Sequence, residues 1–171
     1  FTPSGDLALM TLIRPKNLIP SIQVEGGWMM THGIGVIDQN NEERIIQLLT
    51  DQPNAYYSDS FDIVVSPDGK RAYVSNAGAD KITVMSVDSI RAIIKETPKE
   101  QLKNIANNLG VSSRFVIDRI STGANPKGLA LSPDGKKLYI AEQLEDKIGV
   151  LNTETLKMET AIDLGGPTRI T

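Results

Sequence analysis

The chain has 171 residues, of which 40% are hydrophobic, 23% charged and 5% aromatic, and its formal net charge is −3. This composition is that of a folded globular chain, and it excludes a disordered or collagen-like chain and argues against a basic nucleic-acid-binding surface. The absence of cysteine excludes disulfides, zinc–thiolate sites, iron–sulfur clusters and covalently attached c-type haem within these residues.

The first 59 residues predict a partial blade of a repeated β-structure. Phe-Thr-Pro-Ser-Gly-Asp at 1–6 predicts a tight turn, and apolar runs at 7–9 and 33–38 predict two strands. Between them, an insertion at 13–30 ends in Gly-Gly-Trp-Met-Met. We expect this insertion to be a loop that extends from the blade.

A complete blade is predicted over 60–123. Its centre is a Ser-Pro-Asp-Gly turn at 66–69, in which Pro fixes φ, Asp bonds back to the backbone and Gly adopts a positive φ. Short runs of branched apolar residues predict four antiparallel strands, at 63–65, 72–76, 80–84 and 115–120.

A helical insertion is predicted at 88–112, between the third and fourth strands of this blade. Asp88 is a candidate N-cap, and the Thr-Pro-Lys-Glu sequence at 97–100 matches a capping box with Pro at the first helical position. Gly110 is a natural helix end. The apolar residues between them have helical spacing and predict one apolar face, at Leu102, Ile105, Ala106 and Leu109.

The same pattern recurs 66 residues further on, which predicts another blade over 124–166 and the start of a next blade at 167–171. The Ser-Pro-Asp-Gly turn returns at 132–135. Four short strands are predicted again, at 129–131, 138–142, 146–150 and 158–164. Four strands per repeat, with Gly/Pro turns, predict an all-β fold, a β-propeller of which this chain forms about three blades.

The repeated Ser-Pro-Asp-Gly-Lys-x-x-Tyr sequence resembles the YVTN family of β-propeller repeats, which form seven-bladed propellers. The residues at 121–135 resemble the family's joint between blades, and those at 155–160 its third-to-fourth strand hairpin. A narrower resemblance rests on Gly-Trp-Met-Met-Thr-His-Gly-Ile-Gly-Val at 27–36 together with the helical insertion. It is to the propellers that accompany di-haem cytochrome c peroxidase-like proteins, including the propeller subunits of hydrazine synthases.

These resemblances imply a non-catalytic scaffold or interaction subunit of a multihaem redox complex, located outside the cytoplasm. Haem would then lie on partner chains such as c-type cytochromes, and the insertions at 13–30 and 88–112 would dock a partner. The rest of the propeller ring is a further expected partner, and no apolar run approaches the roughly 20 residues that cross a membrane. Two alternatives stay open: a metal-dependent propeller hydrolase of lactonase type, and a free-standing cell-surface or periplasmic binding protein.

Candidate metal ligands are few. His32 is the only histidine, and its imidazole, with the thioether of Met29 or Met30, suits copper or haem iron. The alternative interpretation is a strand or loop residue that makes a hydrogen bond. Asp59 and Asp62 fall at the joint that enters the second blade, where carboxylates suit a calcium ion or acid catalysis.

Other polar residues are predicted to act in structure or in partner binding. Asp80 and Asp146 occupy the same repeat position, which favours a structural role in a loop. No nucleophile elbow, phosphate-binding loop or zinc-protease motif is present, so no catalytic residue is predicted. Blade joints and second-to-third strand loops share one face of a propeller, and partner-binding residues are predicted there, at Trp28, Met29, Met30, Asn76, Asn125 and Glu142.

Overall fold

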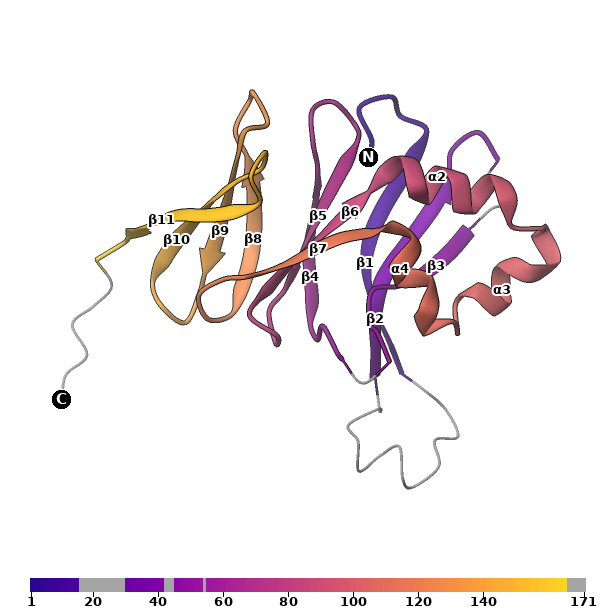
Figure 1. Cartoon of the computed structure of the whole chain (residues 1–171), viewed down its shortest axis with the longest axis horizontal. Coiled ribbons are helices and arrows are strands. Elements are labelled where there is room, and N and C mark those ends of the chain that lie inside the picture. Colours follow the sequence, from indigo (N-terminus) through magenta and orange to yellow (C-terminus); the bar gives the residue numbers. More distant parts are fainter. Residues whose placement is uncertain (16–29, 42–44, 54, 166–171) are drawn as a thin grey trace, which may run out of the picture.

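The computed structural model describes residues 1–15, 30–41, 45–53 and 55–165. Three antiparallel sheets lie side by side along the long axis of the molecule, and the helices flank the first two sheets (Figure 1). This arrangement confirms the predicted all-β class and its organisation in blades. Among the described helices, none has the length and apolar character needed to span a membrane.

The first sheet has three strands in the order β1-β2-β3, which are β1 (Leu7–Pro15), β2 (Met30–Asp38) and β3 (Ile45–Leu49). β1 continues to Pro15 and pairs there with Met30, so the two strands extend into the ends of the range 13–30 that was predicted as an insertion. Residues 16–29, with Trp28 and Met29, lie outside the described residues. β3 had not been predicted.

The second and third sheets are complete four-stranded blades. The second contains β4 (Ser60–Val65), β5 (Arg71–Asn76), β6 (Lys81–Ser86) and β7 (Val116–Ser121) in consecutive order. The third contains β8 (Pro126–Leu131), β9 (Lys137–Glu142), β10 (Lys147–Asn152) and β11 (Lys157–Asp163), also in consecutive order. The strands predicted from the repeat therefore exist, and most differ from the prediction by one to three residues at an end.

The repeated turns contact one another between blades. Within each turn the Ser hydroxyl donates to the Asp carboxylate, as Ser66 does to Asp68. Gly135 has φ +70°, and a methyl group added to it would lie 2.8 Å from Cδ of Pro67 in the preceding turn. Gly69 lies against Pro3 in the same way, at 3.4 Å. Each turn therefore packs its Pro on the Gly of the next turn.

The helical insertion begins with α2 (Val87–Glu96). Its N-cap is Ser86, whose hydroxyl accepts the N–H of Ser89, so the prediction of Asp88 as N-cap was wrong. Thr97 is the C-cap of α2, where its N–H donates to the carbonyl of Ile93. The predicted capping box is therefore not formed, because Thr97 ends one helix instead of starting another.

The second half of the insertion is broken where one continuous helix was predicted. It consists of η1 (Lys99–Gln101), α3 (Leu102–Ile105), η2 (Leu109–Val111) and α4 (Ser112–Phe115). The Asn108 side chain accepts the N–H of Gly110 and starts a new turn there. The three segments after η1 each turn an apolar side chain inward, and the buried ones are Leu102, Val111 and Phe115.

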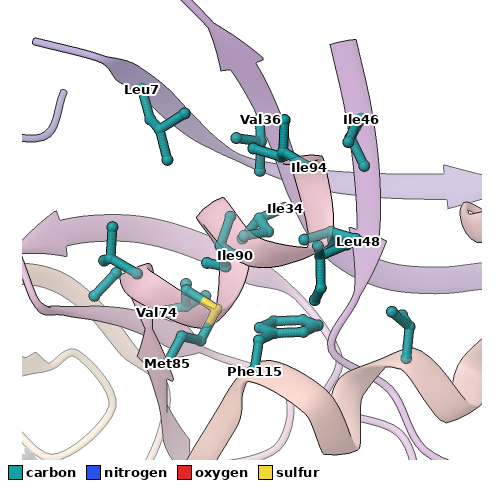
Figure 2. Close-up of a cluster of buried hydrophobic side chains, with 14 of the residues drawn as sticks. Leu7, Ile34, Val36, Ile46, Leu48, Val74, Met85, Ile90, Ile94 and Phe115 are labelled. Atoms are coloured by element: carbon teal, nitrogen blue, oxygen red, sulfur yellow. The ribbon is translucent and has the colours of Figure 1, made fainter. Parts of the chain in front are cut away.

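The insertion forms part of the largest core (Figure 2). Ile34, Val36, Ile46 and Leu48 of the first sheet pack with side chains of β5, β6 and the helices, namely Ala72, Val74, Met85, Val87, Ile90, Ile93, Ile94 and Phe115. The apolar face of the insertion is thus buried inside the molecule. The first two sheets cover this face, and docking of a partner by the insertion at 88–112 stays a prediction.

The second sheet is buried on both faces. Ala72, Val74 and Met85 point to the first core, whereas Tyr73, Ile82 and Val84 point to the opposite side. There they pack against the third sheet, in a second core completed by Ile120, Leu138, Ile140 and Leu151. The alternation follows from the two-residue period of a strand.

Arg91 of α2 ties the helix to the first turn. Its Nε donates to Oδ2 of Asp6 at 2.7 Å, and its Nη1 donates to Oδ1 of Asp88 at 2.8 Å. Thr2 and Ser4 also donate their hydroxyls to Asp6. The hydrogen bond from Arg91 is the main cause that holds the pKa of Asp6 well below its usual range.

Replacing Phe115 with Ala tests the role of the insertion in the core. Phe115 is fully buried, so its truncation leaves a cavity, and we expect the free energy of unfolding to fall by about 3–5 kcal/mol. Urea unfolding followed by circular dichroism measures it. Ile117→Ala is the control, because Ile117 is 48% exposed, and an equal effect of the two variants would contradict the packing.

Replacing Arg91 with Met tests the link to Asp6 through its pH dependence. A depressed carboxyl pKa stabilises the fold above the ordinary pKa of about 3.9, and this contribution disappears as the pH falls toward the lowered value. We therefore expect wild type to be more stable than Arg91→Met at pH 7, and the difference to shrink as the pH falls below about 5. Urea unfolding over a pH series measures this, and a pH-independent difference would refute it.

Candidate functional site

The blade joints and the second-to-third strand loops meet at one end of the sheets, here called the joint face. The N–H of Ala77 donates to the carbonyl of Asp59, and the N–H of Gln143 donates to that of Asn125. The same bond therefore joins loop and joint in two successive blades. Figure 1 shows this end of the three sheets at the lower side of the view. The predicted site residues that the structure describes lie at or near it.

His32 and Asp51 form a buried pair on this face. Asp51 has no exposed surface, and its carboxylate accepts the N–H groups of His32 and Tyr57, both at 2.8 Å. His32 is 7% exposed, and its Nδ1 lies 3.4 Å from Oδ2 of Asp51 and has no hydrogen-bond partner among the described residues. Asp51 thus fixes β2 relative to the chain segment that follows β3.

Arg119 of β7 reaches this pair from the second sheet. Its guanidinium lies over the ring of Tyr57, with 4.2 Å from Cζ to the ring centroid, and donates to the carbonyl of Thr50 at 2.8 Å. Burial lowers the pKa of Arg119, while Tyr57 and Asp51 act in the opposite direction. Burial also raises the pKa of Tyr56, and the negative charge of Asp51 adds to this effect. These residues lock the first blade to the second.

Asp59 and Asp62 have separate roles. Asp59 has φ +57° and presents its carbonyl to the loop of its own blade. The carboxylate of Asp62 accepts the N–H of Leu129 in the third sheet at 2.9 Å. The structure therefore places Asp62 as a bridge between two blades.

Asn76 and Glu142 occupy equivalent positions and are both buried. The amide of Asn76 donates to the carbonyl of Tyr57 at 2.9 Å, and its oxygen accepts the hydroxyl of Thr83 at 2.7 Å. The carboxylate of Glu142 accepts the N–H of Gly123 at 2.8 Å. Each side chain holds the joint that enters its own blade.

The larger side chain of Glu142 is accommodated by a second change in the repeat. Gly149 stands at the position equivalent to Thr83, and a methyl group there would collide with the Glu142 carboxylate. The larger side chain at 142 and the missing side chain at 149 therefore compensate each other in this blade.

Asp80 and Asn125 link the second blade to the third. Asp80 Oδ1 accepts the N–H of Asn125 at 2.7 Å, and the Asn125 amide donates to the carbonyl of Ala77 at 3.2 Å. This agrees with the structural role expected for Asp80. Met30, at the start of β2, is 42% exposed. Partner binding by Met30, Asn76, Asn125 and Glu142 stays a prediction, as it does for Trp28 and Met29.

The structure does not bring the predicted metal ligands together. Within the described ranges, no group of three or more His, Cys, Asp or Glu side chains is placed to hold a metal ion. The His32 ring instead lies beside the Asp51 carboxylate, the backbone carbonyl of Asp59 accepts the N–H of Ala77, and the Asp62 carboxylate accepts an N–H of the third sheet. Metal binding at these residues stays a prediction.

Sequence reasoning missed Asp51 and Arg119. Asp51 follows a strand that had not been predicted, and its partners lie 19 and 6 residues away. Arg119 contacts Thr50 across 69 residues. The one available indication was that neither residue belongs to the shared repeat motif.

A cavity of about 500 Å³ lies at the opposite end, between the turns of the second and third blades. Arg71 crosses it and donates to the carbonyl of Thr153. Burial raises the pKa of Tyr73 in its wall. Three basic and three acidic side chains line this cavity, so it has no dominant charge: Lys70, Arg71, Lys136, Asp68, Asp134 and Glu154.

Comparison with known proteins relates the chain to one enzyme complex. It is 27% identical to hydrazine synthase subunit beta of Kuenenia stuttgartiensis over 153 residues, which are 90% of this chain and 40% of that protein. It superposes on the solved hydrazine synthase of K. stuttgartiensis with a TM-score of 0.83 and 26% identity, over 92% of this chain and 44% of that one. The chain therefore spans less than half the length of the relatives that it matches.

More distant structures show the fold alone. AztD of Citrobacter koseri has a TM-score of 0.52 at 15% identity, over 80% of this chain and 32% of that one. A streptogramin B lyase has a TM-score of 0.52 at 16% identity, over 82% of this chain and 38% of that one. These likenesses confirm the partial propeller.

The comparisons separate the two resemblances stated for the sequence. They support the narrower one, because the chain is similar to subunit beta of hydrazine synthase along most of its length. No family model matches the chain. The resemblance to YVTN repeats therefore stays a prediction.

Replacing Asp51 with Asn tests the His32–Asp51 pair. The amide keeps one acceptor oxygen, so one buried backbone N–H loses its partner, and we expect the free energy of unfolding to fall by about 1–3 kcal/mol. Asp59→Asn is the matched control, because no described residue hydrogen-bonds to that carboxylate and Asn tolerates its positive φ. Urea unfolding of both variants measures this, and equal stability would contradict the assigned role.

Proposed function

We propose that this chain is a non-catalytic propeller scaffold in a multi-subunit redox enzyme complex of the hydrazine synthase type. The observation that carries the proposal is its likeness to hydrazine synthase, with 27% identity to subunit beta over 90% of the chain. The structural agreement is also much closer, with a TM-score of 0.83 against 0.52 for the two other propellers.

The use of polar side chains on the joint face supports a scaffold role. Asp51, Asp62, Asp80 and Glu142 each accept a backbone N–H group within or between blades. Such bonds fix the position of the joints and occupy the groups that a catalytic site would use. The face thus offers a rigid surface to other subunits.

In this proposal the redox chemistry belongs to partner chains. Haem would be held by c-type cytochrome subunits, because the 171 residues contain no cysteine for covalent attachment. The complex would lie outside the cytoplasm, as expected from the resemblance to extracytoplasmic propellers. Exposed apolar side chains on the joint face, such as Leu144, suit contact with a partner.

The complex purified from its source tests this function. We expect native mass spectrometry to find the polypeptide in a multi-subunit assembly, and the same fraction to show the visible absorption bands of haem. A colourless preparation in which the polypeptide travels alone would contradict the proposal.

A pair of surface variants tests the face used. Leu144→Lys places a charge on the joint face, and we expect it to reduce capture of the partner subunits by the tagged polypeptide. Ile117→Lys is the control, because Ile117 is also exposed but lies on the outer strand β7. Equal capture by both variants would place the contact elsewhere.

A further inference from the structure

The space between the first and second turns is occupied by a guanidinium from the helical insertion. Arg91 donates from Nε to Oδ2 of Asp6 in the first turn, and its Nη1 lies 3.5 Å from the carbonyl oxygen of Gly69 in the second turn. The negative charge of Asp6 thus faces a positive charge that the same chain supplies.

The space between the second and third turns receives no such side chain. In the second blade β6 runs into α2, which carries Arg91. In the third blade only residues 153–156 separate β10 from β11, so an equivalent of Arg91 is missing there. The space remains as the cavity of about 500 Å³ between the turns at 66–70 and 132–136. Sites for small molecules have volumes of this order.

The charge next to the turn glycine is reversed at this cavity. Asp6 follows the glycine of the first turn, whereas Lys70 and Lys136 follow the glycines of the second and third turns. Both lysines are exposed and line the cavity. Among the described residues, neither ammonium group has a hydrogen bond or an ion pair. Because an ammonium replaces the carboxylate, the complementary occupant changes from a cation to an anion.

The aspartates of the cavity are bonded within their own turns. Oδ1 of Asp68 accepts the hydroxyl of Ser66 at 2.5 Å and the N–H of Lys70 at 3.0 Å. Asp134 accepts the same two bonds in the third turn. Together with the exposed Glu154, these carboxylates balance the charge of the empty cavity. The ammonium groups of the two lysines still lack an acceptor.

The floor of the cavity holds a third cationic group in a fixed position. Arg71 donates to the carbonyl of Thr153 on the opposite wall, and the hydroxyl of Thr153 donates to the carbonyl of Gly135 at 2.6 Å. The ring of Tyr73 beneath is 1% exposed. A guanidinium has five N–H groups, so the bond to Thr153 and the contact with the Tyr73 hydroxyl leave others for a ligand. The first turn has Leu7 at the equivalent position, so this donor belongs to the second turn.

We propose that this cavity binds a small molecule that carries an oxyanion, either a carboxylate or a phosphate. The guanidinium of Arg71 binds the oxyanion at the floor, where its planar N–H groups suit two oxygens at once. Lys70 and Lys136 close over it from the two turns. The site lies at the end of the sheets opposite to the joint face, and the inference is independent of the enzyme complex proposed above.

Equilibrium dialysis of the natural polypeptide, expressed from its complete coding sequence, tests the site. The probes are radiolabelled inorganic phosphate and radiolabelled acetate, and we expect saturable binding of at least one of them. The double variant Lys70→Gln/Lys136→Gln should weaken this binding by about tenfold or more, because it removes two charged donors. Lys103→Gln/Lys157→Gln is the matched control, since it removes the same charge from exposed lysines outside the cavity.

The outcomes separate a built site from general attraction of anions. Binding that is weakened by the cavity variant and kept by the control supports the proposal, and the probe that binds identifies the oxyanion. Saturable binding of neither probe would overturn it, as would equal affinities of the two double variants.

A charge reversal and a direct localisation complete the test. Lys70→Asp gives the second turn the charge that Asp6 has in the first, and we expect it to abolish binding while circular dichroism stays unchanged. Crystals of the same polypeptide soaked in selenate, a heavy analogue of an oxyanion, should show anomalous density beside Arg71. Anomalous density only at other positions, or undiminished binding by Lys70→Asp, would refute the proposal.

Discussion

The second sheet has apolar side chains on both faces, and the fold depends on covering both. In the second sheet, Val74 and Met85 point one way and Tyr73 and Val84 the other, and all four are buried. Such a sheet cannot remain stable with one face in water, because the hydrophobic gain is proportional to the apolar area removed from it. Stacking of successive blades meets this requirement, and the repeated Pro–Gly contacts set the distance at which the turns meet.

The helical insertion covers the apolar face of the first sheet, in which three strands are described. Side chains of α2 and α4, including Ile90, Ile94 and Phe115, complete the core between the first and second sheets (Figure 2). The insertion is therefore a structural part of the blade pair, and Arg91 fixes it further by its bond to Asp6 in the first turn. A helix that covers a core on one side leaves its polar side to solvent.

The sequence predicted what the repeat specifies locally and missed what distant contacts decide. The Ser-Pro-Asp-Gly turns and their flanking strands follow from residue type and spacing, and the structure contains them. The prediction of one helix over 98–109 was wrong because it rested on the spacing of apolar residues alone. That spacing contains no information on the Asn108 side chain, which starts a new turn by accepting the N–H of Gly110. The His32–Asp51 pair was missed for a related reason, since its bonds join chain segments that no repeat relates.

The polar residues of the joint face show how a repeat conserves a contact while changing its chemistry. The second blade has Asn76 and Thr83 at two positions where the third blade has Glu142 and Gly149. Both pairs hold the joint that enters their own blade. A buried polar side chain must find a hydrogen-bond partner, so a larger acceptor is tolerated only where a neighbour gives up its own side chain. The two blades therefore fix the same joint with different buried side chains on a common backbone. This position requires a buried side chain that bonds to the incoming joint, and an amide donor or a carboxylate acceptor meets that requirement.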